Sequence, residues 1–194
     1  TRDQEDTTKK SHDMRKALSM LFLMLCTAVA SAQEETDRTA IMAVDKNGYI
    51  VFDGWQCPDF TVKMTDGSEI SISSLRGKVV MLQFTASWCP VCRKEMPFIE
   101  RDIWQKHKDN PDFALIAIDR DEPLETVLKF AETTKITYPI GLDPGADIFA
   151  KFALRDAGIT RNVLLDRDGR IIKRTRLYNE EEFASLVEAI NKEL

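Results

Sequence analysis

Short apolar runs, each closed by glycine or by polar turn residues, divide this chain into predicted strands. The run Lys78–Thr85 is apolar at nearly every position, which predicts a central strand covered on both faces of a sheet. Phe60–Met64 and Glu69–Ile72 alternate in polarity around the turn pair Asp66-Gly67, which predicts a β-hairpin. The other predicted strands are Ile41–Val44 and Tyr49–Phe52 around Asn47-Gly48, Phe113–Ile118, Tyr138–Leu142, and the hairpin of Asn162–Leu165 with Arg170–Thr175.

Longer segments with apolar residues three and four positions apart predict helices between these strands. The longest begins after Cys89 and runs to about Lys108, with Pro90 in its first turn and Pro97 expected to kink it. Strands that alternate with helices and end in a hairpin indicate an α/β fold, with a central mixed sheet and helices on both of its faces. The remaining predictions are a helical turn at Ser73–Gly77, helices at Pro123–Thr134, Ala146–Ala153 and Glu180–Leu194, and an acidic loop at Asp119–Glu122.

The first part of the chain has the layout of an export signal. Met14-Arg15-Lys16 is a basic start, Ala17–Ala30 is apolar, and small residues precede the cleavage expected after Ala32. The apolar run is shorter than the ~20 residues that a membrane-spanning helix needs. A lipoprotein anchor on Cys26 is the weaker alternative, because the bulky Leu25 precedes it where such sites need a small residue.

We therefore expect an upstream segment and a removed signal peptide at 1–32, a leader with short strands at 33–52, and one folded domain at 53–194. The 194 residues carry a formal net charge of −5 without a basic cluster, which argues against nucleic acid as a partner. Cleavage would leave three cysteines, and one pair plus a single thiol fits an exported redox protein better than a disulfide-stapled scaffold. We expect a monomer in the periplasm or another extracytoplasmic space.

Trp88-Cys89-Pro90-Val91-Cys92 joins the apolar strand to the longest predicted helix. Two cysteines with this spacing can close a disulfide within one helical turn, and the unpaired N–H groups at a helix start favour a thiolate. The stretch therefore predicts reversible dithiol–disulfide chemistry, with no cofactor. Half of a structural zinc site has the same spacing, and Cys57 and His107 would complete four ligands. The strand–helix context favours the redox interpretation over a metal site.

Six segments follow one another in an order that carries a family resemblance: Pro58-Asp59-Phe60, Leu75-Arg76-Gly77-Lys78-Val79-Val80, Trp88-Cys89-x-x-Cys92 with Glu95 and Pro97, Gly158-Ile159, Asn162–Asp166, and Asp168-Gly169. Together they resemble the thioredoxin superfamily, and more closely its exported TlpA/ResA-like branch, from Cys57 to the end of the chain. The resemblance implies a thioredoxin-like fold with an extra N-terminal β-hairpin, and thiol–disulfide oxidoreductase activity.

The same resemblance implies roles for individual residues. Cys89 corresponds to the exposed cysteine that attacks a partner's disulfide, and Cys92 to the buried cysteine that resolves the mixed disulfide. Trp88 is expected to pack beside the pair and limit the access of water. Glu95 matches the acidic residue of the family's Cys-x-x-Cys-x-x-Glu-x-Pro motif and is expected to exchange a proton with Cys92, unless it is a solvated glutamate. Thioredoxins carry a buried aspartate where this chain has Gln83, so a proton relay falls to Glu95 or to water.

The family has a cis-proline in the loop that faces the cysteines, and this chain has Thr160 there. A cis bond before a residue other than proline costs about 3–4 kcal/mol, so Ile159–Thr160 is either a strained cis peptide or part of a reshaped trans loop. Ile159, Thr160 and Arg161 are expected to offer backbone groups to an extended substrate segment. The Thr160 hydroxyl is also placed to hydrogen-bond the Cys89 sulfur.

Three further residues each have two interpretations. Cys57 replaces a small residue of the family and is either a small buried hydrophobe or a third redox thiol. Arg93 and Lys94 either stabilise thiolates or form a solvated helix face.

The leading hypothesis is an exported thiol–disulfide oxidoreductase that exchanges its Cys89–Cys92 pair with disulfides of partner proteins and is reduced again by a membrane thiol donor. Pro90 and Val91 place no polar or basic group between the cysteines. We therefore expect a reductant, with a potential nearer the ~−270 mV of thioredoxin than the ~−120 mV of DsbA. The resemblance also implies work such as keeping haem-attachment cysteines reduced during cytochrome c maturation.

Two other functions compete with this hypothesis. A thiol peroxidase of the peroxiredoxin type has the pattern Pro-x-x-x-Thr-x-x-Cys, but Thr85 lies four residues before Cys89 and no proline matches. A non-enzymatic metal-binding module of the copper-delivering type has Cys-x-x-x-Cys and a downstream histidine, whereas no histidine follows His107.

Overall fold

The computed structural model describes residues 44–194. The predicted signal peptide at 1–32, the cleavage after Ala32 and the alternative lipid site at Cys26 lie outside the described residues. So does most of the predicted strand Ile41–Val44, and the extra N-terminal hairpin is therefore not confirmed. Across residues 44–194, no helix combines the length and the apolar character needed to cross a bilayer.

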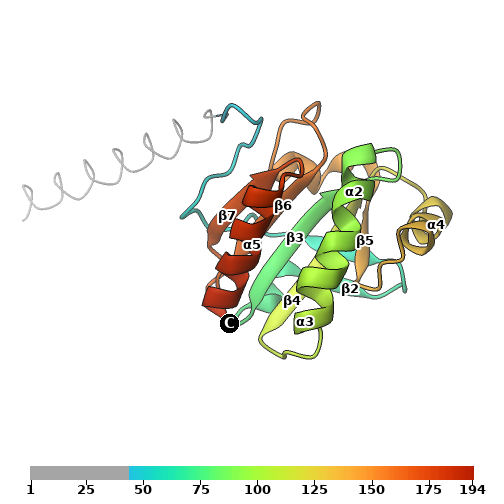
Figure 1. The fold of residues 1–194 in the computed structure, drawn as a ribbon. Coiled ribbons are helices and arrows are strands. Elements are labelled where there is room, and N and C mark those ends of the chain that lie inside the picture. Colours follow the sequence, from blue (N-terminus) through green and yellow to red (C-terminus); the bar gives the residue numbers. More distant parts are fainter. Residues whose placement is uncertain (1–43) are drawn as a thin grey trace, which may run out of the picture. The chain divides into compact units, whose positions relative to one another are not determined.

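Seven strands form one mixed sheet in the order β2-β1-β5-β4-β3-β6-β7 (Figure 1). Strand β3 pairs in parallel with β4 and antiparallel with β6, and β5 pairs in parallel with β4. Antiparallel hairpins, β1–β2 and β6–β7, close the two edges. The strands are β1 (Thr61–Met64), β2 (Glu69–Ser71), β3 (Val79–Thr85), β4 (Phe113–Arg120), β5 (Ile140–Asp143), β6 (Arg161–Leu165) and β7 (Ile171–Arg176).

The predicted central strand and the two hairpins are confirmed. Every residue of β3 is buried, because this strand has a neighbour on each edge and packed side chains on each face. The turn at Asp66-Gly67 connects β1 with β2, and Gly67 has a φ of +88°, which a side chain would disfavour. Strand β3 begins after a single turn of 3₁₀-helix, Ile72–Leu75, where a helical turn was predicted.

Three α-helices cover one face of the sheet: α2 (Pro90–Ile99), α4 (Leu124–Thr134) and α5 (Glu180–Glu193). As predicted, α2 begins at Pro90 and contains Pro97, which lacks the N–H of a regular helix. A π-helical segment, Glu100–Trp104, and the short α3 (Gln105–His107) continue it. Figure 1 shows α2 and α5 side by side across the strands. This arrangement places the N-terminus of α2 at the carboxyl end of β3.

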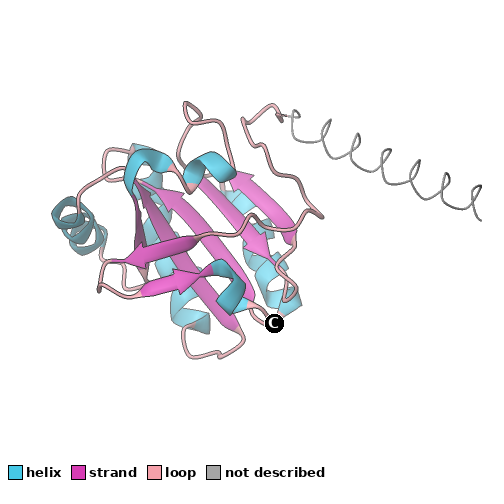
Figure 2. Cartoon of the chain, turned by 180° about the vertical axis from the view of Figure 1, so that it is seen from behind, coloured by secondary structure: helices cyan, strands magenta, loops and turns pink. Residues whose placement is uncertain are grey.

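The opposite face carries no α-helix within residues 44–194, so the predicted helix Ala146–Ala153 is wrong. Two separate 3₁₀ turns, Pro144–Ala146 and Phe149–Lys151, replace it. In Figure 2, which views the molecule from the side opposite to Figure 1, these turns lie in front of the strands. Gly145 and Ala146 both have a positive φ, which a continuous helix does not allow. The turns belong to a buried apolar cluster that includes Phe84 of β3, Tyr49, and Phe152 at the end of the second turn.

Two further predictions need correction. Tyr49–Phe52 is not a strand; only Tyr49 makes an isolated bridge, to Ala153, while its hydroxyl donates to the Thr175 carbonyl. The acidic segment expected as a loop begins inside β4, which extends to Arg120. Asp119 still pairs with both neighbouring strands, β3 and β5, and Arg120 pairs with Asp143 of β5, so the strand continues into the acidic segment.

Gly141 lies in β5, opposite Met64 of β1, which pairs antiparallel with β5. A Cβ at this position would overlap the Cγ2 of Val62 and lie 3.3 Å from the Sδ of Met64. We expect Gly141→Ala to lower the free energy of unfolding by about 1–3 kcal/mol, because β1 must shift to make room. Urea denaturation measures this, with the exposed Lys63→Ala of β1 as a control expected to change it by less than about 0.5 kcal/mol. A stabilised Gly141→Ala variant would contradict the packing described here.

Candidate active site

Cys89 and Cys92 form a disulfide at the start of α2, with 5.3 Å between their Cα atoms. Cys89 is the N-cap residue of the helix, and its sulfur accepts a hydrogen bond from the Cys92 N–H at 3.1 Å. Pro90 occupies the first turn, where its missing N–H costs nothing. The first turn of α2 thus directs an unpaired N–H group and the positive end of the helix dipole at the Cys89 sulfur, as predicted.

Thr160 contacts both sulfurs. Its Oγ1 lies 3.2 Å from the Cys89 Sγ and 3.3 Å from the Cys92 Sγ, so the predicted contact with Cys89 is present and a second one accompanies it. The Ile159–Thr160 peptide is trans, which decides between the two predicted loop conformations. The Thr160 carbonyl accepts a hydrogen bond from the Leu177 N–H, which ties the loop to the end of β7.

The other two residues of the predicted substrate-binding loop point inward. Ile159 is buried, and the Arg161 side chain is fully buried with its guanidinium 4.2 Å above the Tyr49 ring. Arg161 also donates to the carbonyl oxygens of Gly158 and Asn47. Both side chains therefore support the loop from beneath, and any direct contact with a partner belongs to the loop backbone.

Trp88, predicted to pack beside the disulfide and limit the access of water, leaves most of its own surface to solvent. It is 61% exposed, whereas Cys89 is 5% exposed and Cys92 is fully buried. The first turn of α2 and the Thr160 loop both contact the Cys89 sulfur. The predicted exposure of Cys89 is therefore wrong for the oxidised protein, although Cys89 is the more accessible of the two cysteines.

Glu95 is buried and hydrogen-bonded, which excludes the solvated alternative. Its Oε1 accepts from the Asn162 Nδ2 at 2.7 Å, and Asn162 also donates to the Thr175 hydroxyl at 3.0 Å. Burial raises the pKa of Glu95 to about 7, although the hydrogen bond from Asn162 and the nearby Gln83 amide oppose the shift. Its Oε2 has no hydrogen-bond partner among residues 44–194. A carboxyl group in this environment changes its protonation near neutral pH.

The sequence shows Gln83 in place of an aspartate, but the contacts of Gln83 and Glu95 could not be read from it. Gln83 of β3 lies opposite Asn162 of β6 in the sheet register, and its Oε1 accepts from the Tyr138 hydroxyl at 2.8 Å. The one signal in the sequence was a polar Gln83 inside an otherwise apolar strand. Its partners come from distant segments, so the pattern along the chain did not identify them.

Cys57 is a small buried hydrophobe, the first of its two interpretations. It is 4% exposed, and burial raises the pKa of its thiol to about 12, against a smaller opposing effect of Arg76. A thiol that stays protonated at neutral pH is a poor nucleophile.

The positions of His107 and Cys89 exclude the zinc site that was the predicted alternative. The His107 ring packs against Phe113 at 5.4 Å, and Phe113 pairs with the first residue of β3. Cys89 lies four residues beyond the other end of that seven-residue strand, so roughly 20 Å of strand separates it from His107. In the described part of the chain, no cluster of three or more His, Cys, Asp or Glu residues is arranged to hold a metal ion.

The two basic residues after the cysteines have different surroundings. Arg93 donates from Nε to the Ser87 carbonyl at 2.7 Å and lies over the Phe130 ring. Lys94 extends toward the Tyr178 ring, with Nζ 5.2 Å from its centroid. Arg93 therefore binds the loop that carries the cysteines, whereas Lys94 belongs to the helix surface.

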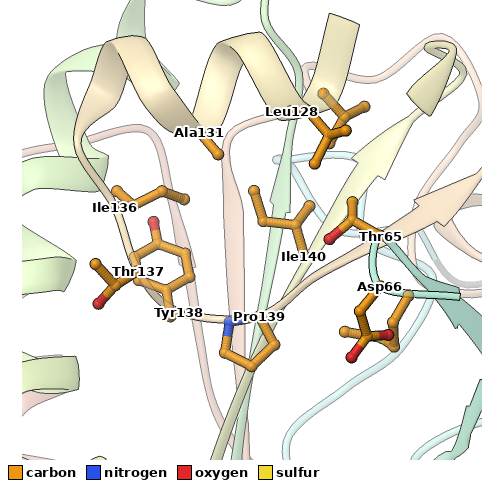
Figure 3. A pocket seen from close by; sticks show the side chains of 11 residues that line it. Thr65, Asp66, Leu128, Ala131, Ile136, Thr137, Tyr138, Pro139 and Ile140 are labelled. Carbon is orange, nitrogen blue, oxygen red and sulfur yellow. The ribbon is translucent and has the colours of Figure 1, made fainter. Parts of the chain in front are cut away.

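A pocket of about 260 Å³ opens between α4, β5 and the β1–β2 turn (Figure 3). Figure 3 shows Leu128 and Ala131 of α4 above Ile140, with Asp66 at the turn. None of the residues predicted from the sequence to act in catalysis lines this pocket. The reactive disulfide therefore lies outside it, at the junction of the β3–α2 loop with α2.

Comparison with known proteins agrees with this geometry. Residues 52–190 match the Redoxin family model. The thiol-disulfide oxidoreductase ResA of a Bacillus cereus strain is 30% identical over 121 residues, which cover 62% of this chain and 68% of the relative.

Solved structures show the same fold. A candidate protein disulfide isomerase from Bacteroides thetaiotaomicron, solved in solution, is 75% identical, with a TM-score of 0.75 over 77% of this chain and 94% of that one. A candidate thiol:disulfide interchange protein DsbE from Chlorobium tepidum is 24% identical, with a TM-score of 0.65 over 73% and 97%. The chain belongs to the Redoxin family and, within the thioredoxin superfamily, is a TlpA/ResA-like thiol–disulfide oxidoreductase.

Proposed function

We propose that this protein is an exported reductant of disulfides in other proteins, with Cys89 as the attacking residue. The observation that carries the proposal is the position of the Cys89 sulfur, which caps the first turn of α2 and receives the Cys92 N–H. In the reduced protein, the same N–H and the helix dipole favour a thiolate on Cys89. Cys92 lies fully buried one turn further along.

The exchange proceeds in two displacements. The Cys89 thiolate attacks one sulfur of the partner's disulfide, forms a mixed disulfide and releases the partner's other sulfur as a thiolate. Cys92 then loses its proton and attacks the Cys89 sulfur. This step releases the second partner sulfur and leaves the Cys89–Cys92 disulfide. Two electrons pass to the partner, and a membrane thiol donor returns them in the next cycle.

Glu95 is the proposed acceptor of the Cys92 proton. It follows Cys92 by three positions on α2, which places both on neighbouring positions of one helix face. A carboxyl group whose pKa is near 7 has protonated and ionised forms of similar free energy at neutral pH, so it can both accept and release a proton there. Gln83 replaces a titratable group on β3 and orients the site through its bond with Tyr138.

The Thr160 loop is the proposed contact for an extended segment of the partner. Thr160 touches both sulfurs, so a partner sulfur bonded to Cys89 must lie beside this loop. The similarity to proteins named ResA and DsbE supports partners that carry disulfides in an extracytoplasmic space. Haem-attachment cysteines of cytochrome c are the substrate class that the TlpA/ResA resemblance suggests.

The peroxidase alternative has an observation against it. The Thr85 hydroxyl, which a peroxidase would need beside its reactive cysteine, donates instead to the Met96 Sδ at 3.5 Å and is buried. We therefore retain disulfide exchange as the single proposed function.

Cys92→Ser should trap the mixed disulfide, because Cys89 still attacks and nothing resolves the product. We expect a covalent adduct with a model partner such as insulin on non-reducing gels, while Cys89→Ser gives none. Wild-type protein should reduce insulin in the presence of dithiothreitol, and Cys57→Ala should behave as the wild type does. Adducts that form through Cys92 in the Cys89→Ser variant would reverse the assigned roles.

The reduction potential of the Cys89–Cys92 pair tests the direction of electron flow. Equilibration with dithiothreitol or glutathione buffers, followed by alkylation of the free thiols, should give a value nearer ~−270 mV than ~−120 mV. The reason is that no polar or basic residue between the cysteines adds to the stability of the thiolate. A potential near ~−120 mV would show an oxidant instead.

Glu95→Gln should change how stability depends on pH. The pKa of Glu95 is about 7 in the folded protein against an ordinary 4.5, so the folded state binds the proton more tightly than the unfolded state. The stability that this proton provides is complete below about pH 4.5 and is lost as the pH rises through about 7. Relative to wild type, Glu95→Gln should therefore gain stability as the pH rises from about 5 to about 8 in urea unfolding. The exposed Glu188→Gln is the control, and parallel curves for Glu95→Gln and wild type would refute the burial effect.

A further inference from the structure

Ser87 lies two residues before Cys89, and all of its polar groups are bound. Its hydroxyl donates to the Glu122 Oε1 at 2.5 Å, and its N–H donates to the Glu122 Oε2. Its carbonyl accepts from the Arg93 Nε at 2.7 Å. The β3–α2 loop is therefore held from one side by a carboxylate that follows β4, and from the other by a guanidinium of α2.

Asp119 lies behind this contact, near the end of β4. It is fully buried, and it pairs in the sheet with Thr85, two residues before Ser87. Neither carboxyl oxygen has an N–H or O–H partner in residues 44–194. A buried ionised carboxylate without donors is strongly unfavourable, so Asp119 is expected to be protonated and to act as a donor itself.

Glu122, three residues further along the chain, is the acidic neighbour that bears on that proton. Burial raises the pKa of Asp119 to about 8, and the charge of Glu122 and a hydrogen bond with it contribute to the rise. One proton shared by two carboxyl groups leaves a single negative charge between them. The two oxygens of Glu122 receive both donors of Ser87.

The charged groups around Asp119 have other partners. On α2, Arg93 is bound to the Ser87 carbonyl and stacks on Phe130 of α4. The next residue of β4, Arg120, points to the other face of the sheet, where it donates to the Ala157 carbonyl and lies over Phe149.

The acidic neighbours are bound as well. Asp121 accepts from the Gly145 N–H, and Asp143 of β5 accepts from the N–H groups of Ile148 and Phe149. On β3, the hydroxyl of Thr85 donates to Met96. No cation therefore lowers the pKa of Asp119 in the part of the chain that the structure describes.

We infer that Asp119 and Glu122 are positioning residues for disulfide exchange: a proton shared by their carboxyl groups keeps Glu122 on Ser87 and thereby fixes the loop that carries Trp88 and Cys89. The inference rests on the proposed reaction at Cys89 and assigns a new role to the β4–α4 connection. Loss of the shared proton to solvent places two negative charges side by side in a half-buried site. Their repulsion moves Glu122 away from Ser87, and the loop loses two hydrogen bonds.

Asp119→Asn is the informative variant, because its amide donates to Glu122 as the protonated carboxyl does but cannot ionise. Second-order rates of exchange with insulin are measured from about pH 6.5 to about pH 9.5 and divided by the thiolate fraction of the pair. Wild type and Asp119→Asn should agree near pH 7. At about pH 9, roughly nine in ten wild-type molecules have lost the proton, so Asp119→Asn should be up to about tenfold faster.

Glu122→Gln offers one acceptor oxygen in place of two and should slow exchange roughly tenfold near pH 7, within the range that misplaced reacting groups cost. The difference from wild type should shrink toward about pH 9, where the wild-type loop has itself lost the contact. Glu125→Gln, an exposed change in the first turn of α4, is the matched control and should leave the profile unchanged. If Glu122→Gln does not fold, the pH profile of the exchange rate of Asp119→Asn tests the inference by itself.

A second readout does not depend on exchange. In the oxidised protein the cysteine pair cannot titrate, so a change of Trp88 fluorescence with a midpoint near pH 8 reports the loop. We expect this change in wild type, its absence in Asp119→Asn, and its loss in Trp88→Phe. Superimposed fluorescence and rate profiles for wild type and Asp119→Asn would overturn the inference. A wild-type protein that shows the fluorescence change but exchanges no disulfide would overturn the proposed function alone.

Discussion

The hydrogen bond from the first turn of α2 to the Cys89 sulfur is the interaction on which the active site depends. A sulfur that is almost fully buried needs protein donors in place of water, and the Cys92 N–H and the Thr160 hydroxyl are both within reach. The first donor is local to the helix. The second comes from the loop before β6, so the pairing of β3 with β6 is as much a part of the site as the cysteines are.

Buried carboxyl groups are the second feature of the helix-covered face. Glu95 and Asp119 both lie there without a cationic partner among residues 44–194, and burial raises both pKa values into the range of neutral or mildly basic pH. Protonated carboxyl groups donate hydrogen bonds, so each group changes its bonding when it ionises. One lies on the helix of Cys92 and the other behind the loop of Cys89, which places a proton-dependent contact on either side of the pair.

Local patterns predicted most of the framework. The apolar run of β3, the turn at Asp66-Gly67 and the helical spacing of α4 depend on neighbours in the chain, and all three are confirmed. The failed helix at Ala146–Ala153 had suitable side chains, but two left-handed backbone conformations and a buried Asp143 that binds the Ile148 and Phe149 N–H groups favour separate turns. Those contacts depend on the position of β5 and are invisible to a local pattern.

Spacing and short motifs were enough to predict the reactive pair, its place between a buried strand and a helix, and the family. Three contacts of the site required the folded chain: Thr160 touches both sulfurs, Arg161 turns inward, and Glu122 holds Ser87. The residues of the first and last contacts lie 71 and 35 positions apart in the chain. Their meeting depends on the order of strands in the sheet, which no local pattern of polar and apolar residues records.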